Sequence, residues 1–320
     1  MSTIFDTIRV RCAEVTELAR FVRIDDDGLA RFAETLATAP WPTEDLDPLH
    51  HFEGEDETML IFVLLLDAIN FGSGWFPHLK KPDGLSGYRT VASACKRYFE
   101  TKGAPTPDEL RSVDSRWMAS LLDQDLSSPE VAELMELFAQ AWRDFGVWLR
   151  DQHEECYASV VESANHSAAR LVESLAEMPL YRDVARYGAL EVPLYKRAQI
   201  TVADLHLAFP RRGWGRFDDL DELTLFADNL VPHVLRCRGV LEYAPSLLAT
   251  IDRGEPLEVG CPEETEIRAV AVHAVELLVA AIGSHGRATS ARALDGMLWN
   301  AGQAREIKAK KRHRGRCSFY

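Results

Sequence analysis

The chain has 320 residues, of which 47% are hydrophobic and 27% are charged, with 19 Gly and 15 Pro. This composition predicts a soluble globular protein with a large core. The longest uninterrupted apolar run, Met59 to Leu66, is far shorter than the roughly 18 residues of a membrane span. The N-terminal residues lack the apolar segment of a secretory signal. We therefore expect no membrane partner.

Charge and cysteine usage narrow the class further. The formal net charge is −14, and residues 305–316 carry seven Lys or Arg and one Glu, which leaves −20 on the remainder. So acidic a body is a poor non-specific binder of nucleic acid. The basic C-terminal segment 305–320 could still hold a single phosphate, or simply form a solvated helix face. Six cysteines are scattered without C-x-x-C or zinc spacing, which favours a reducing cytoplasm and no metal site.

Helical periodicity dominates the first half of the chain. Residues 15–22 and 25–37 are amphipathic, and a Pro-broken acidic loop follows them over residues 37–54. Residues 57–77 begin as a helix too apolar to be exposed, which Gly-Ser-Gly ends. Residues 127–179 predict two long helices, with a break or bend near Glu154 to Tyr157.

The second half is harder to assign. Residues 191–202 permit a short strand, although residues 196–209 also fit a helix, and a Gly-rich loop over 211–217 precedes a helix predicted to begin at Asp218 to Leu223. Residues 263–286 predict a strong helix with these residues facing inward: Ile267, Val270, Ala271, Ala274, Leu277 and Leu278. We expect a mostly α, compact helical domain over residues 1–320 with at most a few short strands. A small N-terminal helical subdomain over 1–48 is an option.

Common catalytic motifs are absent from the sequence. The loop at 211–217 has two glycines but no G-x-G-x-x-G, and neither a P-loop nor a G-x-S-x-G elbow occurs. His273 and Glu276 share a helix face, but a hydrogen bond between them is the better interpretation than a metal site. We expect no cofactor.

Three segments place polar residues in apolar surroundings. Asp67 and Asn70 lie on the very apolar helix, Lys196 lies in PLYKRAQI, and Asp228 lies in LFADNLVPHVL. A Lys or Asp in such a place is a candidate for a perturbed pKa and for function. The alternatives are a structural ion pair between Lys196 and Asp228, or a helix cap by Asp228.

Several blocks stand out between Leu49 and Tyr320: LDAINF, GLSGYRTV, YRDV, LYKRAQI, LTLFADNLVPHVLRCRGVLEY, EIRAVAVHAVELL, LWNAGQ and HRGRCSFY. Together they resemble the queuosine salvage family, the queuosine 5′-phosphate N-glycosylases/hydrolases. The resemblance implies a helical fold distantly similar to helix-hairpin-helix DNA glycosylases. It also implies a reaction, hydrolysis of the N-glycosidic bond of queuosine 5′-monophosphate with release of queuine base, on a small-molecule nucleotide and without direct contact with nucleic acid.

The resemblance also implies site residues. Asp228 matches the family's FAD aspartate, whose carboxylate would stabilise an oxocarbenium-like state, and Lys196 would bind the 5′-phosphate or the ribose as a point charge. His50 or His51 would contact substrate, the doublet leaving the register open, and Tyr88 is either a substrate contact or a core residue. The base could stack on an aromatic ring, for which the candidates are Phe71, Phe226 and Trp299.

Two departures from the family pattern concern the base pocket. Family members often carry acidic residues after the C-terminal LW, where this chain has Trp299-Asn300, and an amide such as Asn300 can bind by hydrogen bonds but offers no charge. NFGSGWF replaces the more usual NFCFW or NFSFW. Two other functions stay open: a non-catalytic helical module that binds a deazapurine nucleoside or a protein partner, and a glycosylase acting on a flipped base, which the acidic body disfavours.

Overall fold

The computed structural model describes residues 2–43, 45–210 and 212–320. The chain forms two compact units, each assembled from separated segments. Unit 1 comprises Met1–Glu44, Asp183–Lys196 and Asp221–Arg316, and unit 2 comprises Asp45–Arg182, Arg197–Leu220 and Cys317–Tyr320. The described residues are mostly helical with four short strands, so the mostly α prediction is confirmed. Residues 1–44 belong to unit 1 together with two distant segments rather than standing apart.

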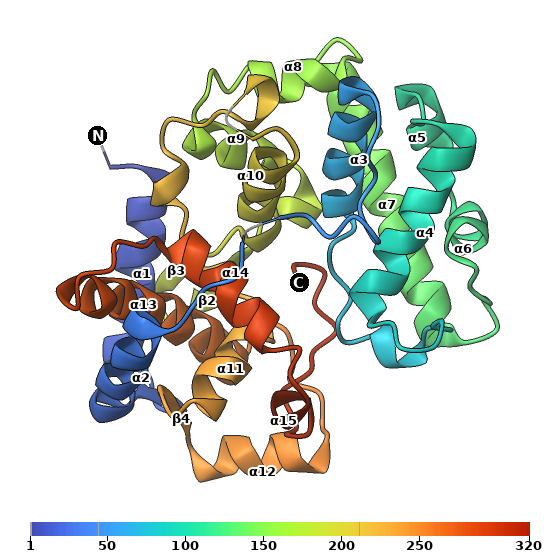
Figure 1. Ribbon diagram of the computed structural model, residues 1–320. Coiled ribbons are helices and arrows are strands. Elements are labelled where there is room, and N and C mark those ends of the chain that lie inside the picture. The colour runs from blue at the N-terminus through green and yellow to red at the C-terminus, as the bar shows by residue number, and fades with distance from the viewer. Residues whose placement is uncertain (1, 44, 211) are drawn as a thin grey trace. The chain divides into compact units, whose positions relative to one another are not determined.

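Unit 1 is built around one long buried helix. Figure 1 shows α13 beside the N-terminal helices α1 and α2, both of which it contacts. The helices of unit 1 are α1 (Ile4–Leu18), α2 (Asp26–Thr38), α11 (Val231–Cys237), α12 (Pro245–Arg253), α13 (Pro262–Ser284), α14 (Ala291–Ala301) and α15 (Arg305–Lys308). The strands form two antiparallel two-stranded sheets, β1 (Val22–Ile24) with the distant β4 (Leu241–Tyr243), and the hairpin of β2 (Val184–Tyr187) with β3 (Leu190–Pro193).

Helix α13 carries both apolar and polar core residues. Its predicted inward positions are buried except Leu277, which is 38% exposed. By length and composition this is the one helix of the described residues that could cross a membrane, but more than half of its apolar window is buried, as in a core helix. Its buried Glu266 accepts hydrogen bonds from the backbone N–H groups of Arg20, Phe21 and Val22 and from the Tyr187 hydroxyl. A buried carboxylate satisfied this fully fixes the start of β1 on α13.

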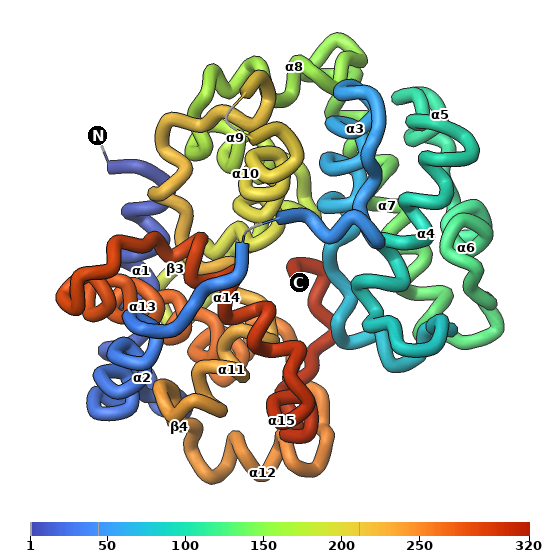
Figure 2. The backbone as a smooth tube through the Cα atoms, in the orientation of Figure 1, coloured from blue at the N-terminus to red at the C-terminus, as the bar shows by residue number. Residues whose placement is uncertain are grey.

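Unit 2 is a helical assembly around α3 and α7. Figure 2 traces α3, α4, α6 and α7 side by side, and α5 also contacts α7. The Trp142 indole of α7 donates to the Leu65 carbonyl of α3 at 3.0 Å. The helices of this unit are α3 (Asp56–Ala68), α4 (Gly87–Lys102), α5 (Pro107–Ser112), α6 (Ser115–Leu122), α7 (Pro129–Gln152), α8 (Tyr157–Glu162), α9 (Ala168–Leu175) and α10 (Lys196–Ala208).

Two ambiguous segments are now resolved. The predicted break is present, because α7 ends at Gln152 and Glu154 and Glu155 adopt positive φ before α8 begins. Residues 196–208 form helix α10, and the strand lies just before it as β3.

The prediction that a helix begins at Asp218 to Leu223 is wrong. Only a 3₁₀ turn, η4 (Leu220–Glu222), forms there, and the chain then has no regular secondary structure up to Asp228. The physical reason lies in Asp219, whose carboxylate accepts from the N–H groups of Ala168 and Ala169 at the start of α9. A residue that caps another helix in this way anchors a loop and starts no helix of its own.

Candidate active site

Asp228 lies at the end of an irregular segment, residues 223–228, that leads into α11. Its Oδ1 accepts hydrogen bonds from the N–H groups of Leu230 at 2.7 Å and Val231 at 2.9 Å. The carboxylate thus holds the backbone at the start of α11 from two residues before the N-cap residue, which is Leu230 and not Asp228. The side chain is partly exposed, and within the described residues Oδ2 accepts no hydrogen bond. One oxygen thus fixes the carboxylate while the other remains available to a ligand.

The backbone on the N-terminal side of Asp228 is held from two helices. Arg268 of α13 donates from Nε to the Ala227 carbonyl at 2.9 Å. Asp295 of α14 accepts the Phe226 N–H at 3.1 Å. Because both partners are buried, the carboxylate position is set by the core of unit 1 and not by a mobile loop.

A buried ion pair links Asp228 to the segment that carries Lys196. The guanidinium of Arg268 donates to both oxygens of Asp183, at 3.0 and 2.6 Å. Asp183 in turn accepts the Lys196 N–H at 3.1 Å. The same arginine therefore orients the residue before Asp228 and, through Asp183, the backbone of Lys196. The two residues that the sequence singled out share one rigid frame.

The turn before Lys196 is strained. Tyr195 has φ +45°, in the left-handed region that a tyrosine rarely adopts. The Asp183 carbonyl holds this turn by accepting the N–H groups of Leu194 and Tyr195 at 2.9 and 3.3 Å. Such strain persists where the surroundings over-determine the backbone, which is frequent at functional sites.

The ion-pair alternative for Lys196 and Asp228 fails. Among the described residues, no cation forms a salt bridge with Asp228. Lys196 itself is buried, with 6% of its surface exposed.

Helix α14 carries the two C-terminal candidates. Trp299 is partly exposed and lies one turn beyond Asp295 on the same helix face, while Asn300 is exposed on the next face. Asp295 already binds the Phe226 backbone. Trp299 therefore lies on the helix that contacts the Asp228 segment, and Phe226 lies on that segment itself. Phe226 is 8% exposed.

The remaining candidates lie in unit 2, where two of them meet. His51 contacts the Tyr88 hydroxyl through Nε2 at 3.2 Å and the Asp47 carbonyl through Nδ1 at 3.1 Å. His50 instead contacts the Ser93 hydroxyl through Nδ1 at 2.6 Å. Burial lowers the pKa of both histidines and raises that of Tyr88. Of the doublet, His51 is thus the member joined to a second predicted residue.

Phe71 serves the core of unit 2. Its ring is 1% exposed, contacts Phe138 edge-on at 5.0 Å, and lies 4.7 Å from the guanidinium carbon of Arg197. Arg197 also donates to the Ala68 and Leu180 carbonyls. A base could stack on Phe71 only if that ring were uncovered. Phe226 and Trp299 are therefore the better candidates for the predicted stacking role.

Three residues of this frame escaped the sequence analysis: Asp183, Arg268 and Asp295. Arg268 gave a usable signal, since it is a single cation inside an apolar helical run. Asp183 lies in the YRDV block without an apolar neighbourhood that would mark it. Asp295 looked like an ordinary helix-surface carboxylate, yet it is 6% exposed.

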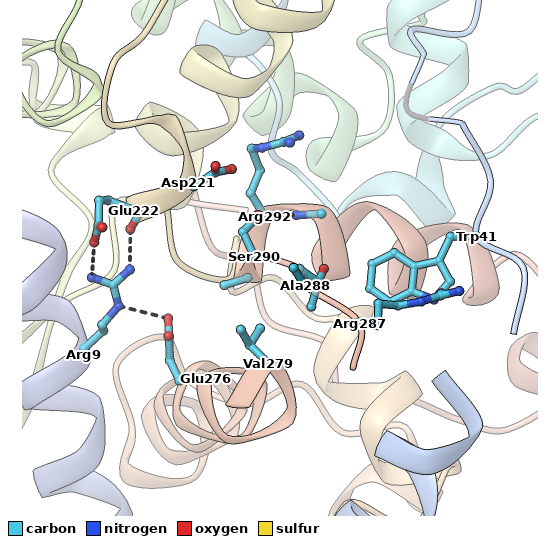
Figure 3. A pocket seen from close by; sticks show the side chains of 13 residues that line it. Arg9, Trp41, Asp221, Glu222, Glu276, Val279, Arg287, Ala288, Ser290 and Arg292 are labelled. Atoms are coloured by element: carbon cyan, nitrogen blue, oxygen red, sulfur yellow. Dashed lines mark hydrogen bonds and ion pairs between the residues drawn. The ribbon is translucent and has the colours of Figure 1, made fainter. Parts of the chain in front are cut away.

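An open hollow of about 750 Å³ lies elsewhere in unit 1, at the start of α14. Figure 3 shows Arg9 reaching Glu222 and Glu276 across it, at 3.1 and 3.2 Å. Glu276 therefore pairs with Arg9 and not with His273. Arg287 stacks on Trp41, with 5.2 Å between the guanidinium carbon and the ring centre. The hollow holds none of the predicted residues, and its Arg9 and Arg287 are engaged by its own walls.

Comparison with known proteins shows the family of this chain. The family model described as "Queuosine salvage protein" matches residues 50–320. The chain belongs to the queuosine salvage protein family. Three similar relatives are each named queuosine 5′-phosphate N-glycosylase/hydrolase. The one from Sphaerobacter thermophilus is 36% identical over 96% of this chain and 95% of its own. Those from Mus musculus and Dictyostelium discoideum are 30% identical, over 96% and 98% of both chains.

In this queuosine salvage protein, the close approach of α14 to α11 depends on Gly302. A Cβ built there would lie 2.8 to 3.0 Å from three Leu230 side-chain atoms. Gly302→Ala should displace Leu230, whose N–H binds Asp228, and lower the free energy of unfolding by about 1–3 kcal/mol. Gly296→Ala on α14 is the matched control, because nothing lies within 4 Å of its Cβ, and it should not destabilise. Thermal unfolding of the two variants would decide, and equal melting temperatures would contradict the packing argument.

The queuosine salvage protein also buries two histidines beside α11. Burial lowers the pKa of His233 from 6.5 to about 4 and that of His313 to about 3. The unfolded chain therefore binds more protons than the folded one below pH 6.5. The free energy of unfolding should fall as pH drops from about 6.5 toward 4, by roughly 1.4 kcal/mol per pH unit for each histidine. Urea titrations at several pH values measure this, and His233→Gln should reduce the slope; an unchanged slope would contradict it.

Proposed function

We propose that this protein is a hydrolase that cleaves the N-glycosidic bond of queuosine 5′-phosphate and releases queuine. The substrate is the one in the names of its relatives. The observation that carries the proposal for this chain is the geometry of Asp228. A carboxylate fixed through Oδ1, with Oδ2 open in a partly exposed position, is suited to stabilise a cation that forms beside it.

The reaction would proceed at the anomeric carbon of the ribose. The C–N bond breaks with its electron pair on the base nitrogen, and the sugar becomes oxocarbenium-like. Asp228 would face that developing positive charge. A water oxygen then bonds to the anomeric carbon. One of the two water protons remains on the new hydroxyl, and the other is taken up by the nitrogen of the leaving base. The products are queuine and ribose 5-phosphate.

Other candidates would recognise the substrate. Lys196 would bind the phosphate or the ribose as a point charge, and its backbone is fixed by Asp183. Phe226 and Trp299 offer rings for the base, and Asn300 offers an amide for its side chain. His51 and Tyr88 would act as a joined pair. We place the reaction in the cytoplasm, in keeping with six cysteines that are all free thiols.

The test is direct. Purified protein is incubated with queuosine 5′-monophosphate and, separately, with queuosine, and free queuine is followed by chromatography while binding is followed by calorimetry. We expect queuine release from the phosphate form with stoichiometric ribose 5-phosphate. If the protein bound either compound without releasing queuine, the non-catalytic binding module would replace the hydrolase.

A further inference from the structure

The basic C-terminal tail is neither a solvated helix face nor a free arm. Only α15 (Arg305–Lys308) is helical, and the residues after it run along α11. The His233 ring contacts the Ile307 carbonyl at 3.0 Å, and Arg236 donates to the Lys311 carbonyl at 2.6 Å. The Arg314 carbonyl accepts the Leu257 N–H at 2.7 Å. The backbone on both sides of residue 312 is therefore pinned within unit 1.

Arg312, between these fixed points, is a cation without a partner. Its side chain is partly buried, and within the described residues its guanidinium makes no hydrogen bond and no salt bridge. The donors of this arginine fork are therefore available to an anion. The carboxylate of Asp228 is the anion that acts on this guanidinium, from beyond contact distance, while Arg314 repels it.

The surroundings of Arg312 are otherwise positive. The charged groups acting on the neighbouring His313 are Arg312, Arg268 and Arg236, and those acting on His233 are Arg236, Arg312 and Lys310. Arg268 is neutralised by Asp183, whereas Arg312 has no such carboxylate. The side of the Asp228 segment that faces Arg312 is therefore electropositive.

We propose that Arg312 binds the 5′-phosphate of the substrate and thereby selects the nucleotide over the nucleoside. The inference rests on the function proposed above. A ribose separates its anomeric carbon from its 5′-phosphate, so a carboxylate serving the first and a cation serving the second must interact without touching, as Asp228 and Arg312 do. The planar fork of arginine matches phosphate oxygens in pairs, which a lysine does not.

The experiment compares the full-length wild type with Arg312→Gln and Lys310→Gln. Lys310 is the matched control, because it is an exposed cation of the same tail. For Arg312→Gln, kcat/KM for queuosine 5′-monophosphate should fall about 10- to 100-fold, the range expected for one charge-assisted hydrogen-bonded contact. The value for queuosine should change less than about threefold. Lys310→Gln should leave both values near those of the wild type.

Binding of ribose 5-phosphate, measured by calorimetry, separates this inference from the proposed function. Ribose 5-phosphate should bind the wild type and Lys310→Gln but lose affinity about 10- to 100-fold in Arg312→Gln. If the wild type released no queuine but this binding pattern were observed, the proposed hydrolase function would be wrong and the proposed phosphate site at Arg312 would be supported. An equal loss for nucleotide and nucleoside, or ribose 5-phosphate binding unaffected by Arg312→Gln, would overturn the inference.

Discussion

Asp228→Asn is expected to leave the protein folded and to lower kcat for queuine release by at least about 10²- to 10³-fold. Asparagine caps a helix about as well as aspartate, so its side-chain oxygen can still accept the N–H groups of Leu230 and Val231. What the variant lacks is the negative charge that the proposed mechanism uses to stabilise the sugar cation. Single-turnover measurements with queuosine 5′-monophosphate report that loss, and circular dichroism reports the fold.

Two further variants separate charge from capping. Asp228→Ala removes both, and should cost about 1 kcal/mol of stability in addition to the activity. Asp114→Asn is the matched control, because Asp114 caps α6 through the Trp117 N–H at 2.7 Å and α6 carries none of the proposed site residues. If Asp228→Asn kept wild-type kcat, Asp228 would be a cap alone.

Local signals in the sequence were sufficient for the features that depend on nearby residues. The apolar period of α13 and the run of α3 predicted buried helices, and the periodicity of residues 127–179 predicted the long helix α7. Asp228 was recognisable because a carboxylate four residues before a proline, in apolar company, has few structural uses other than a cap. Each of these inferences depends only on residues that are close together in the sequence.

Features that depend on distant partners could not be predicted. Asp183 and Arg268 are 85 residues apart, and Asp295 is 69 residues from the Phe226 N–H that it binds. No periodicity links such pairs. The failed helix at Asp218 to Leu223 has the same origin, since Asp219 is used by α9, about 50 residues earlier in the chain. The composition of the tail is that of a charged helix. Composition does not reveal that side chains of α11 would bind the backbone of the tail.

The second large effect is expected at the Asp183–Arg268 pair. Both side chains are almost fully buried, at 3% and 2% exposed. Asp183→Asn should lower the free energy of unfolding by about 3–5 kcal/mol, because the buried guanidinium loses its two short charge-assisted bonds and keeps only the longer ion pair with buried Glu264, at 3.6 Å. That is a large share of the roughly 5–15 kcal/mol that stabilises a typical domain. Glu255→Gln, which breaks the exposed Arg253–Glu255 pair, should change it by less than about 1 kcal/mol.

The double variant Asp183→Asn with Arg268→Met shows whether the pair also positions the site. Removing both charges should recover part of the stability lost in the single variant, because the guanidinium is no longer buried beside a neutral amide. The recovery is partial because buried Glu264 then loses its ion pair with Arg268. Activity should not recover with it. The Lys196 N–H and the Ala227 carbonyl would still lack their charged partners, so Lys196 and the Asp228 carboxylate would no longer be held in register, and misplacement on this scale can cost about 10²-fold. A double variant with wild-type kcat would reduce the pair to a purely structural contact; a stable but slow one would make it the frame on which Asp228 acts.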